Sequence, residues 1–187
     1  MRSTGLVLKK EEEPFACNRC GACCRGRDVP LTLDDIFRLS EFLGMLPDDF
    51  FNEYCIEVAT SAHTVALPFL RRDGESCSFL EDNICQVHFV KPAACEHMPS
   101  TLFGSLEHLR TRMPPSCAIH HTRLEDREDN GRLRKNYIAA MMLTTIYYSQ
   151  HGTFKYKLAK PFIYRILLFK RNRDRLYKFM DTRVASN

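Results

Sequence analysis

The chain has 187 residues and a mass of 21.7 kDa, a length that one domain with its own hydrophobic core can fill. Apolar residues make up 44% and charged residues 27% of the sequence, which excludes a largely disordered chain. No apolar run reaches the roughly 18 residues of a membrane-spanning helix, and residues 1–14 lack the apolar stretch of a secretory signal. The chain has nine cysteines, most of them clustered, and we therefore expect a cytoplasmic protein in which cysteines bind metal rather than form disulfides.

The first predicted elements are a loop and a helix. Residues 1–14 are expected to form a flexible lead-in, and the polar, glycine-containing stretch 15–28 is expected to wrap around a bound group. Apolar residues at helical spacing predict a helix over 33–43. Thr32 is a suitable N-cap for this helix, and Gly44 is a suitable end.

A second helix, over 48–58, is expected after Pro47, and short strands follow it. Cys55 lies on the apolar face of that predicted helix, so we interpret it as a core residue. Strands are predicted over 63–71, 77–80 and 84–88, with turns at Asp73-Gly74 and at 81–83.

The last third of the chain is predicted to be mostly helical. A short helix begins at Pro92, a strand covers 106–113, and a long helix over 131–150 ends at Gly152. Pro161 is expected to open the last helix, over 161–180. We expect a single α+β domain. Its metal-binding region, over 15–120, is loop-rich with short strands, and a helical extension over 121–187 packs on it.

Charge is unevenly distributed along the chain. Residues 155–187 hold ten lysines and arginines and two acids, which gives this segment a net charge of +8. The whole chain carries +4, so residues 1–154 carry −4. Aromatic side chains are interleaved with these cations. A basic, aromatic helix of this kind can dock a protein partner with an acidic surface, a nucleic acid or an anionic membrane surface, although such charge runs are most often only solvated surface.

The strongest chemical signal is the run Cys17-x-x-Cys20-Gly-x-Cys23-Cys24. The C-x-x-C spacing lets two thiolates reach one metal around a tight turn, and Gly21 removes a Cβ where the backbone must approach the metal. Neighbouring side chains of an extended segment point to opposite sides. We therefore expect Cys23 and Cys24 to serve two different centres, or two metals of one cluster.

Four more cysteines follow downstream, and with the run they make eight candidate ligands: Cys17, Cys20, Cys23, Cys24, Cys77, Cys85, Cys95 and Cys117. Eight thiolates would complete two four-ligand sites, and one site with spare cysteines is the alternative. Three cysteines at steps of three favour a [4Fe–4S] cluster over Zn²⁺, which all-sulfur ligation also suits. His88, His120 and His121 are weaker candidates, because lone histidines are more often structural.

The motif Phe15-x-Cys17-x-x-Cys20-Gly-x-Cys23-Cys24 resembles the signature of the YkgJ-type cysteine-cluster family, described as zinc- or iron-chelating CxxCxxCC domains. The start of the first helix, over 31–36, and three downstream motifs strengthen the resemblance over residues 15–120. These motifs are Cys77-x-Phe-Leu, Cys85-x-Val-His and Lys91-Pro-x-x-Cys95 with Pro99. The resemblance implies a small prokaryotic metal-binding protein in which the cysteines from Cys17 to Cys95, apart from Cys55, are ligands.

A more distant resemblance connects the same signature to flagellin lysine-N-methylases, which are associated with a [4Fe–4S] cluster and with methyl transfer from S-adenosylmethionine. Those proteins are longer chains, and we expect their additional C-terminal region to be absent from this protein. Three alternative functions therefore stay open. The first is a metal-binding protein in electron transfer, sensing or a larger complex. The others are a cluster-dependent methyltransferase acting on protein lysines and a zinc-stabilised binding module with a basic C-terminal tail.

Overall fold

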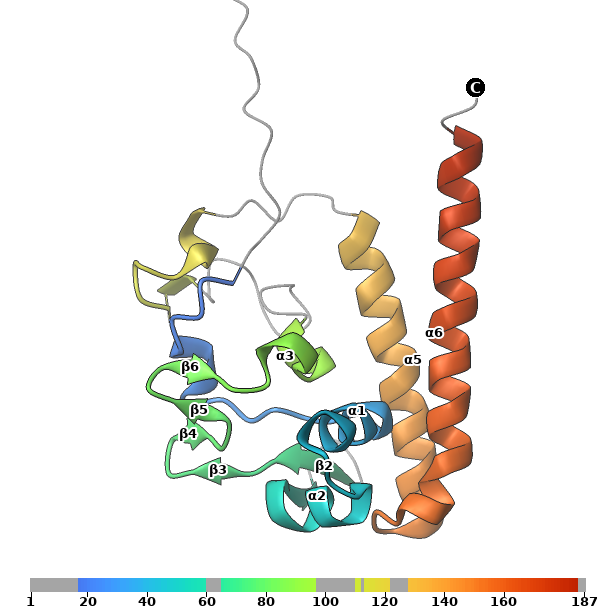
Figure 1. The fold of residues 1–187 in the computed structure, drawn as a ribbon, viewed down its shortest axis with the longest axis horizontal. Coiled ribbons are helices and arrows are strands. Elements are labelled where there is room, and N and C mark those ends of the chain that lie inside the picture. Colours follow the sequence, from blue (N-terminus) through green and yellow to red (C-terminus); the bar gives the residue numbers. More distant parts are fainter. Residues whose placement is uncertain (1–16, 60–64, 97–109, 112, 122–127, 185–187) are drawn as a thin grey trace, which may run out of the picture.

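The computed structural model describes residues 17–59, 65–96, 110–111, 113–121 and 128–184, with the backbone alone at 121, 128–133 and 173–184. It confirms the predicted α+β class. Short elements gather on one side of the molecule, and two long helices run side by side along the other (Figure 1). In chain order the elements are η1 (Ala22–Cys24), α1 (Leu33–Leu43), α2 (Pro47–Tyr54), β1 (Cys55–Ala59), β2 (Ala66–Leu70), β3 (Arg72–Asp73), β4 (Ser76–Cys77), β5 (Leu80–Glu81), β6 (Ile84–Cys85), η2 (His88–Val90), α3 (Ala93–Glu96), η3 (Ala118–His121), α5 (Glu128–His151) and α6 (Tyr156–Val184).

Helix α1 begins and ends as its sequence predicts. The Thr32 hydroxyl accepts the backbone N–H of Asp35 at 3.3 Å, and the Asp35 carboxylate accepts the N–H of Thr32 at 3.0 Å. This capping box satisfies two backbone donors that a helix start leaves free. At the other end, Gly44 has a φ of 68°, which a residue with a Cβ seldom adopts.

The predicted helix over 48–58 is wrong beyond Tyr54. Residues Cys55–Ala59 form β1, which pairs antiparallel with β2 in the register Cys55↔Leu70 to Ala59↔Ala66. Ile56 and Val58 are β-branched and favour a strand once a partner strand is available. Cys55 is nevertheless a core residue, as predicted, with 3% of its surface exposed.

Two hairpins replace the single strand that was predicted over 77–80. Cys77 ends β4 and Leu80 begins β5, so the segment is divided between two hairpins. The second hairpin turns at Asp82 and Asn83, whose φ values of 46° and 65° are those of a two-residue type I′ turn. The predicted strand over 84–88 is limited to β6, because His88 already begins η2.

Helix α3 follows Pro92 as expected, whereas the strand predicted over 106–113 falls mostly outside the described residues. Where that segment is described, the backbone is helical at 110–111 and bent at 113, so the prediction is wrong there. The predicted helix over 131–150 is confirmed within α5, and Gly152 follows it with a φ of 75°.

The last helix starts five residues before Pro161, which lies inside α6. Two acceptors allow the earlier start. Asp48 accepts the N–H of Tyr156 at 2.8 Å, and the Lys155 carbonyl accepts the N–H of Ala159 at 2.9 Å. Pro161 lacks an N–H, so the carbonyl of Lys157 has no i+4 helical partner. Within the described ranges, no helix combines the length and the apolarity that crossing a bilayer requires.

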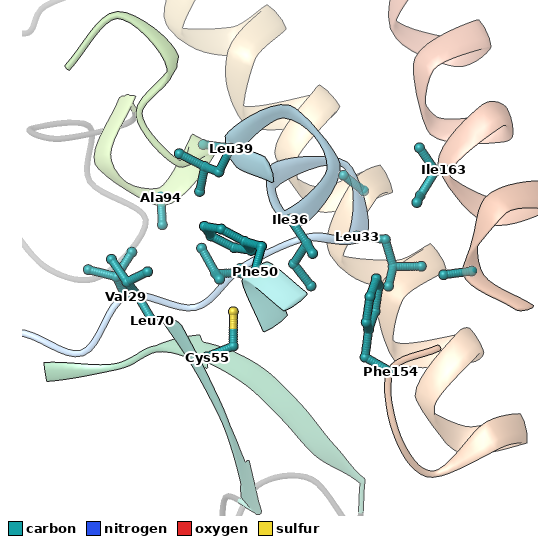
Figure 2. Close-up of a cluster of buried hydrophobic side chains, with 14 of the residues drawn as sticks. Val29, Leu33, Ile36, Leu39, Phe50, Cys55, Leu70, Ala94, Phe154 and Ile163 are labelled. Atoms are coloured by element: carbon teal, nitrogen blue, oxygen red, sulfur yellow. The ribbon is translucent and has the colours of Figure 1, made fainter. Parts of the chain in front are cut away.

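A single cluster of buried side chains joins α1, α2, β1, β2, α5 and α6 (Figure 2). Phe50 lies at its centre, and the Cys55 thiol points into it. The cluster continues toward the short elements through Val29, whose carbonyl accepts the N–H of Leu70 at 2.9 Å. The cysteine-bearing segments therefore stand directly on a closed apolar core.

A candidate metal centre

All eight cysteines that the sequence singles out line one cavity of about 70 Å³. They come from four separate parts of the chain, and residues as distant as Cys17 and Cys117 meet there. One water needs about 10–15 Å³ measured in the same way, so the cavity has room for a group of several atoms. Cys55 does not line this cavity and lies in the core instead.

The run from Cys17 to Cys24 enters the cavity through a turn at Gly21. Gly21 has a φ of 74°, and a Cβ built on it would lie 3.1 Å from the Arg25 side chain. The left-handed backbone thus favours glycine here, and a Cβ would also crowd the Arg25 side chain. The Arg25 guanidinium also donates to the Asn83 side chain, which ties the run to the second hairpin.

The expectation that Cys23 and Cys24 point to opposite sides is wrong. Both residues belong to η1, a 3₁₀ helix, in which successive side chains are about 120° apart rather than 180°. Their thiols are hydrogen-bonded to each other. Both sulfurs therefore face the same cavity.

The two hairpins deliver one thiol each from equivalent positions. Cys77 pairs with Arg72 and Cys85 pairs with Leu80, so each cysteine ends the returning strand of a hairpin with a two-residue turn. The N–H of Gly26 donates to the Glu75 carbonyl at 2.8 Å and fixes the first hairpin beside the cysteine run.

Backbone amides point at four of the sulfurs, and sequence reasoning missed them. The Arg19 N–H donates to Cys17 Sγ at 3.4 Å. The same i+2 arrangement recurs where the N–H groups of Phe79, Val87 and Ile119 donate to the thiols of Cys77, Cys85 and Cys117. A donated hydrogen bond favours the thiolate, the form that binds metal. The sequence signal for these donors is weak, since any residue other than proline at i+2 supplies one.

The thiols surround the cavity instead of closing on one point. Across the described part of the chain, no three side chains of cysteine, histidine, aspartate or glutamate are placed to hold a single ion. Thiols that do touch form pairs, Cys23 with Cys24 and Cys20 with Cys117. Four sulfurs around one zinc ion would lie about 3.8 Å from one another, given a Zn–S bond of about 2.3 Å and tetrahedral geometry.

A comparison with protein families identifies this arrangement. The family model of the CxxCxxCC domain, a candidate zinc- or iron-chelating domain, matches residues 16–129. The chain belongs to the CxxCxxCC family. The match covers more than half of the chain and agrees with the resemblance found in its cysteine motifs. No curated protein and no solved structure matches the chain significantly.

The charge on the thiols of this CxxCxxCC domain is set by their neighbours. The hydrogen bond from Cys24 lowers the pKa of Cys23 to about 6 against the opposing effect of burial, and the charges of Arg27 and Lys91 contribute. The same hydrogen bond raises the pKa of Cys24. At neutral pH the pair therefore holds one thiolate.

Burial disfavours the thiolate form of the deeper cysteines. Burial raises the pKa of Cys95 to about 12, and the positive charge of Arg27 opposes the rise. Arg27 also donates to the Ala94 carbonyl at 2.7 Å, and Asp35 accepts the N–H of Ala93 at 3.0 Å. These two contacts hold the short helix α3, and with it Cys95, against the loop before α1 and the N-terminal end of α1.

The three candidate histidines have different surroundings. His88 lines the cavity, and its Nε2 is buried without a hydrogen-bond partner. The ring of His120 is outside the cavity lining, and its Nε2 is 3.0 Å from the Met113 carbonyl. The side chain of His121 lies outside the described ones. The donor set of the cavity, eight thiols with amide donors and cationic neighbours, fits a metal group.

Proposed function

We propose that the cavity holds iron–sulfur, as one or two [4Fe–4S] clusters bound by the eight cysteines, and that the protein acts in electron transfer, in sensing or as a subunit of a larger complex. The observation that carries this proposal is the meeting of eight thiols around one cavity. When bound, such a cluster supplies the exchange of single electrons.

The size and spread of the site favour a cluster over a single zinc ion. The cavity admits a group of several atoms, and its sulfurs are distributed around that space. Cys23 interacts electrostatically with the thiols of both hairpins and with Cys95 and Cys117. The thiols therefore belong to one connected group rather than to two distant sites.

The chain's own residues would stabilise the bound group in three ways. The amides of Arg19, Phe79, Val87 and Ile119 donate to the ligand sulfurs, and hydrogen bonds to ligand sulfurs raise the reduction potential of a cluster. Arg27 and Lys91 offset the negative charge of the thiolates. Apolar residues in the cavity wall, Val29, Leu70 and Val87, exclude water on the core side.

The proposal is tested by purifying the protein without oxygen and measuring iron, acid-labile sulfide and the visible spectrum. We expect a brown protein with about four or eight irons per chain and matching sulfide. A Cys23→Ser variant should lose iron, whereas Cys55→Ala, which alters a thiol outside the cavity, should retain it. Colourless protein with stoichiometric zinc would contradict the cluster and support the zinc form.

A second candidate function, polyanion binding, is favoured by the surface of the two long helices, α5 and α6. Residues 134–172 contain eight lysines and arginines and no acid. Lys157, Lys160 and Arg171 of α6 are exposed, and one cation, Lys170, pairs with Asp34. Binding of this kind weakens steeply with salt. The test is retention on a polyanionic resin at low salt, with Lys157→Glu/Lys160→Glu as the variant that should elute earlier. Absence of any retention would reject this candidate.

A further inference from the structure

One polar atom in the cavity wall has no partner. Of the four buried side-chain atoms among the described residues that lack a hydrogen bond, only Nε2 of His88 belongs to a residue that lines the cavity. A buried ring nitrogen without a partner is unfavourable, so such an atom in a native fold calls for a ligand. The eight thiols around the same cavity indicate what kind of ligand that is.

The chain holds His88 at ligand spacing from Cys85. The two residues are separated by Gln86 and Val87, the spacing that places two side chains on one metal around a tight turn. The two residues between them are held by backbone hydrogen bonds: the Gln86 N–H donates to the Phe79 carbonyl at 2.9 Å, and the Val87 N–H donates to the Cys85 thiol. The position of His88 relative to its neighbouring thiol is therefore set by the backbone.

The surroundings of His88 favour the neutral ring, the form in which imidazole binds metals. Burial lowers its pKa, and the nearby charges of Lys91 and Arg19 lower it further. The neutral ring carries a nitrogen lone pair, and when Nδ1 bears the proton this lone pair is on Nε2. The nearby charges therefore favour the form of the ring whose Nε2, which faces no hydrogen-bond partner, can bind a metal.

We propose that His88 is a metal ligand, whose Nε2 donates its lone pair to one iron of the group in the cavity and replaces one of the eight thiolates. This inference rests on the proposed iron–sulfur function. Coordination by histidine in place of cysteine removes one negative charge from the cluster and raises its reduction potential. His88 thereby adds to the site a residue that the cysteine motif does not include.

Pulsed electron paramagnetic resonance on the reduced protein tests this ligand directly. The protein is prepared without oxygen, once with natural histidine and once with ¹⁵N-histidine, and is reduced with dithionite. Wild type should show a strong nitrogen coupling to the cluster that changes with the isotope. The matched control is His120→Gln, which alters a ring bonded to the Met113 carbonyl outside the cavity and should retain the coupling.

Two variants separate ligation from folding. His88→Gln should lose the isotope-sensitive coupling, and His88→Cys, which restores a ligand, should lose the coupling while binding as much iron as wild type. Iron-replete wild type without a histidine coupling, or a coupling that persists in His88→Cys, overturns the proposal and leaves the cluster function intact. Wild type that binds no iron overturns both.

Discussion

The two sides of the molecule are stabilised in different ways. On one side, helices α1, α5 and α6 have 11, 24 and 29 residues, and their facing side chains, such as Leu33 and Tyr147, are fully buried. On the other side, four strands have two residues each, and two of their residues, Cys77 and Cys85, line the thiol cavity together with the cysteine run. Strand pairs of this length are not stable alone, because they bury little apolar surface. The comparison teaches that apolar burial is concentrated in one half, and we infer that a bound metal contributes much of the stability of the other.

Removing the metal should produce the largest difference between the two sides of the molecule. In small metal domains the binding energy is also folding energy, about 10–16 kcal/mol for structural zinc. Chelation without oxygen should therefore abolish hydrogen-exchange protection over 72–96, whereas α5 over 137–150 should stay protected. Adding iron and sulfide back should restore the lost protection. Equal loss in both halves, or no loss in either, would contradict a division into two regions.

A mutation that makes a large cavity in the apolar core should have the opposite effect, because it should destabilise the helical side and leave metal binding intact. Phe50 is fully buried between α1 and β1, so Phe50→Ala should lower the free energy of unfolding by about 3–5 kcal/mol. Iron per folded molecule should stay unchanged. Phe42→Ala is the control, because Phe42 is 48% exposed and should cost less than about 0.5 kcal/mol. Chemical denaturation with iron analysis gives both quantities, and iron loss in Phe50→Ala without unfolding would contradict the account.

A smaller effect is expected at the turn that opens the cysteine run. Gly21→Ala forces a Cβ into a left-handed backbone, at a cost of about 1–2 kcal/mol, and also against the Arg25 side chain. Gly26 has a similar φ of 65° but open space around it, so Gly26→Ala isolates the backbone cost. Thermal unfolding of the iron-bound variants should show Gly21→Ala as the less stable. Equal stability would show that Arg25 simply moves away.

The smallest difference concerns the pH dependence of the core cysteine. Burial raises the pKa of Cys55 from 9.0 to about 12. The unfolded thiol ionises first, so the stability that Cys55 contributes is complete below pH 9 and is lost as pH rises toward 12. Cys55→Val, which cannot ionise, should therefore lose about 1.4 kcal/mol less than wild type between pH 7 and pH 10. Urea unfolding at both pH values measures the difference, and parallel profiles would place the thiol in contact with water.

Local chemistry could be predicted from the sequence, and distant pairing could not. The capping box of Thr32 and Asp35 and the end at Gly44 depend on neighbouring residues, so they are readable from sequence. The start of α6 depends on Asp48, which lies 108 residues before Tyr156 in the sequence, and strand β1 depends on pairing with β2. Contacts between residues so far apart in the sequence leave no local pattern from which they could be predicted.

The same distinction applies to the candidate site. The sequence led us to expect that eight cysteines would gather, and all eight line one cavity, while their role as ligands stays a prediction. The common orientation of Cys23 and Cys24 could not be predicted, because it depends on the 3₁₀ turn of η1. The amide donors at i+2 are backbone groups that every residue but proline carries, so only coordinates show which of them face a sulfur.

Thiol footprinting tests the central claim most directly, since it counts the sulfurs that a bound metal protects. Metal-loaded and anaerobically stripped protein are treated with an alkylating reagent, and the modified cysteines are located by mass spectrometry. We predict that at least seven of the eight cavity thiols are protected in loaded protein and react after stripping, while Cys55 stays protected in both. Cavity thiols that react equally with and without metal, or that are joined as disulfides, would contradict the claim that they hold a metal group together.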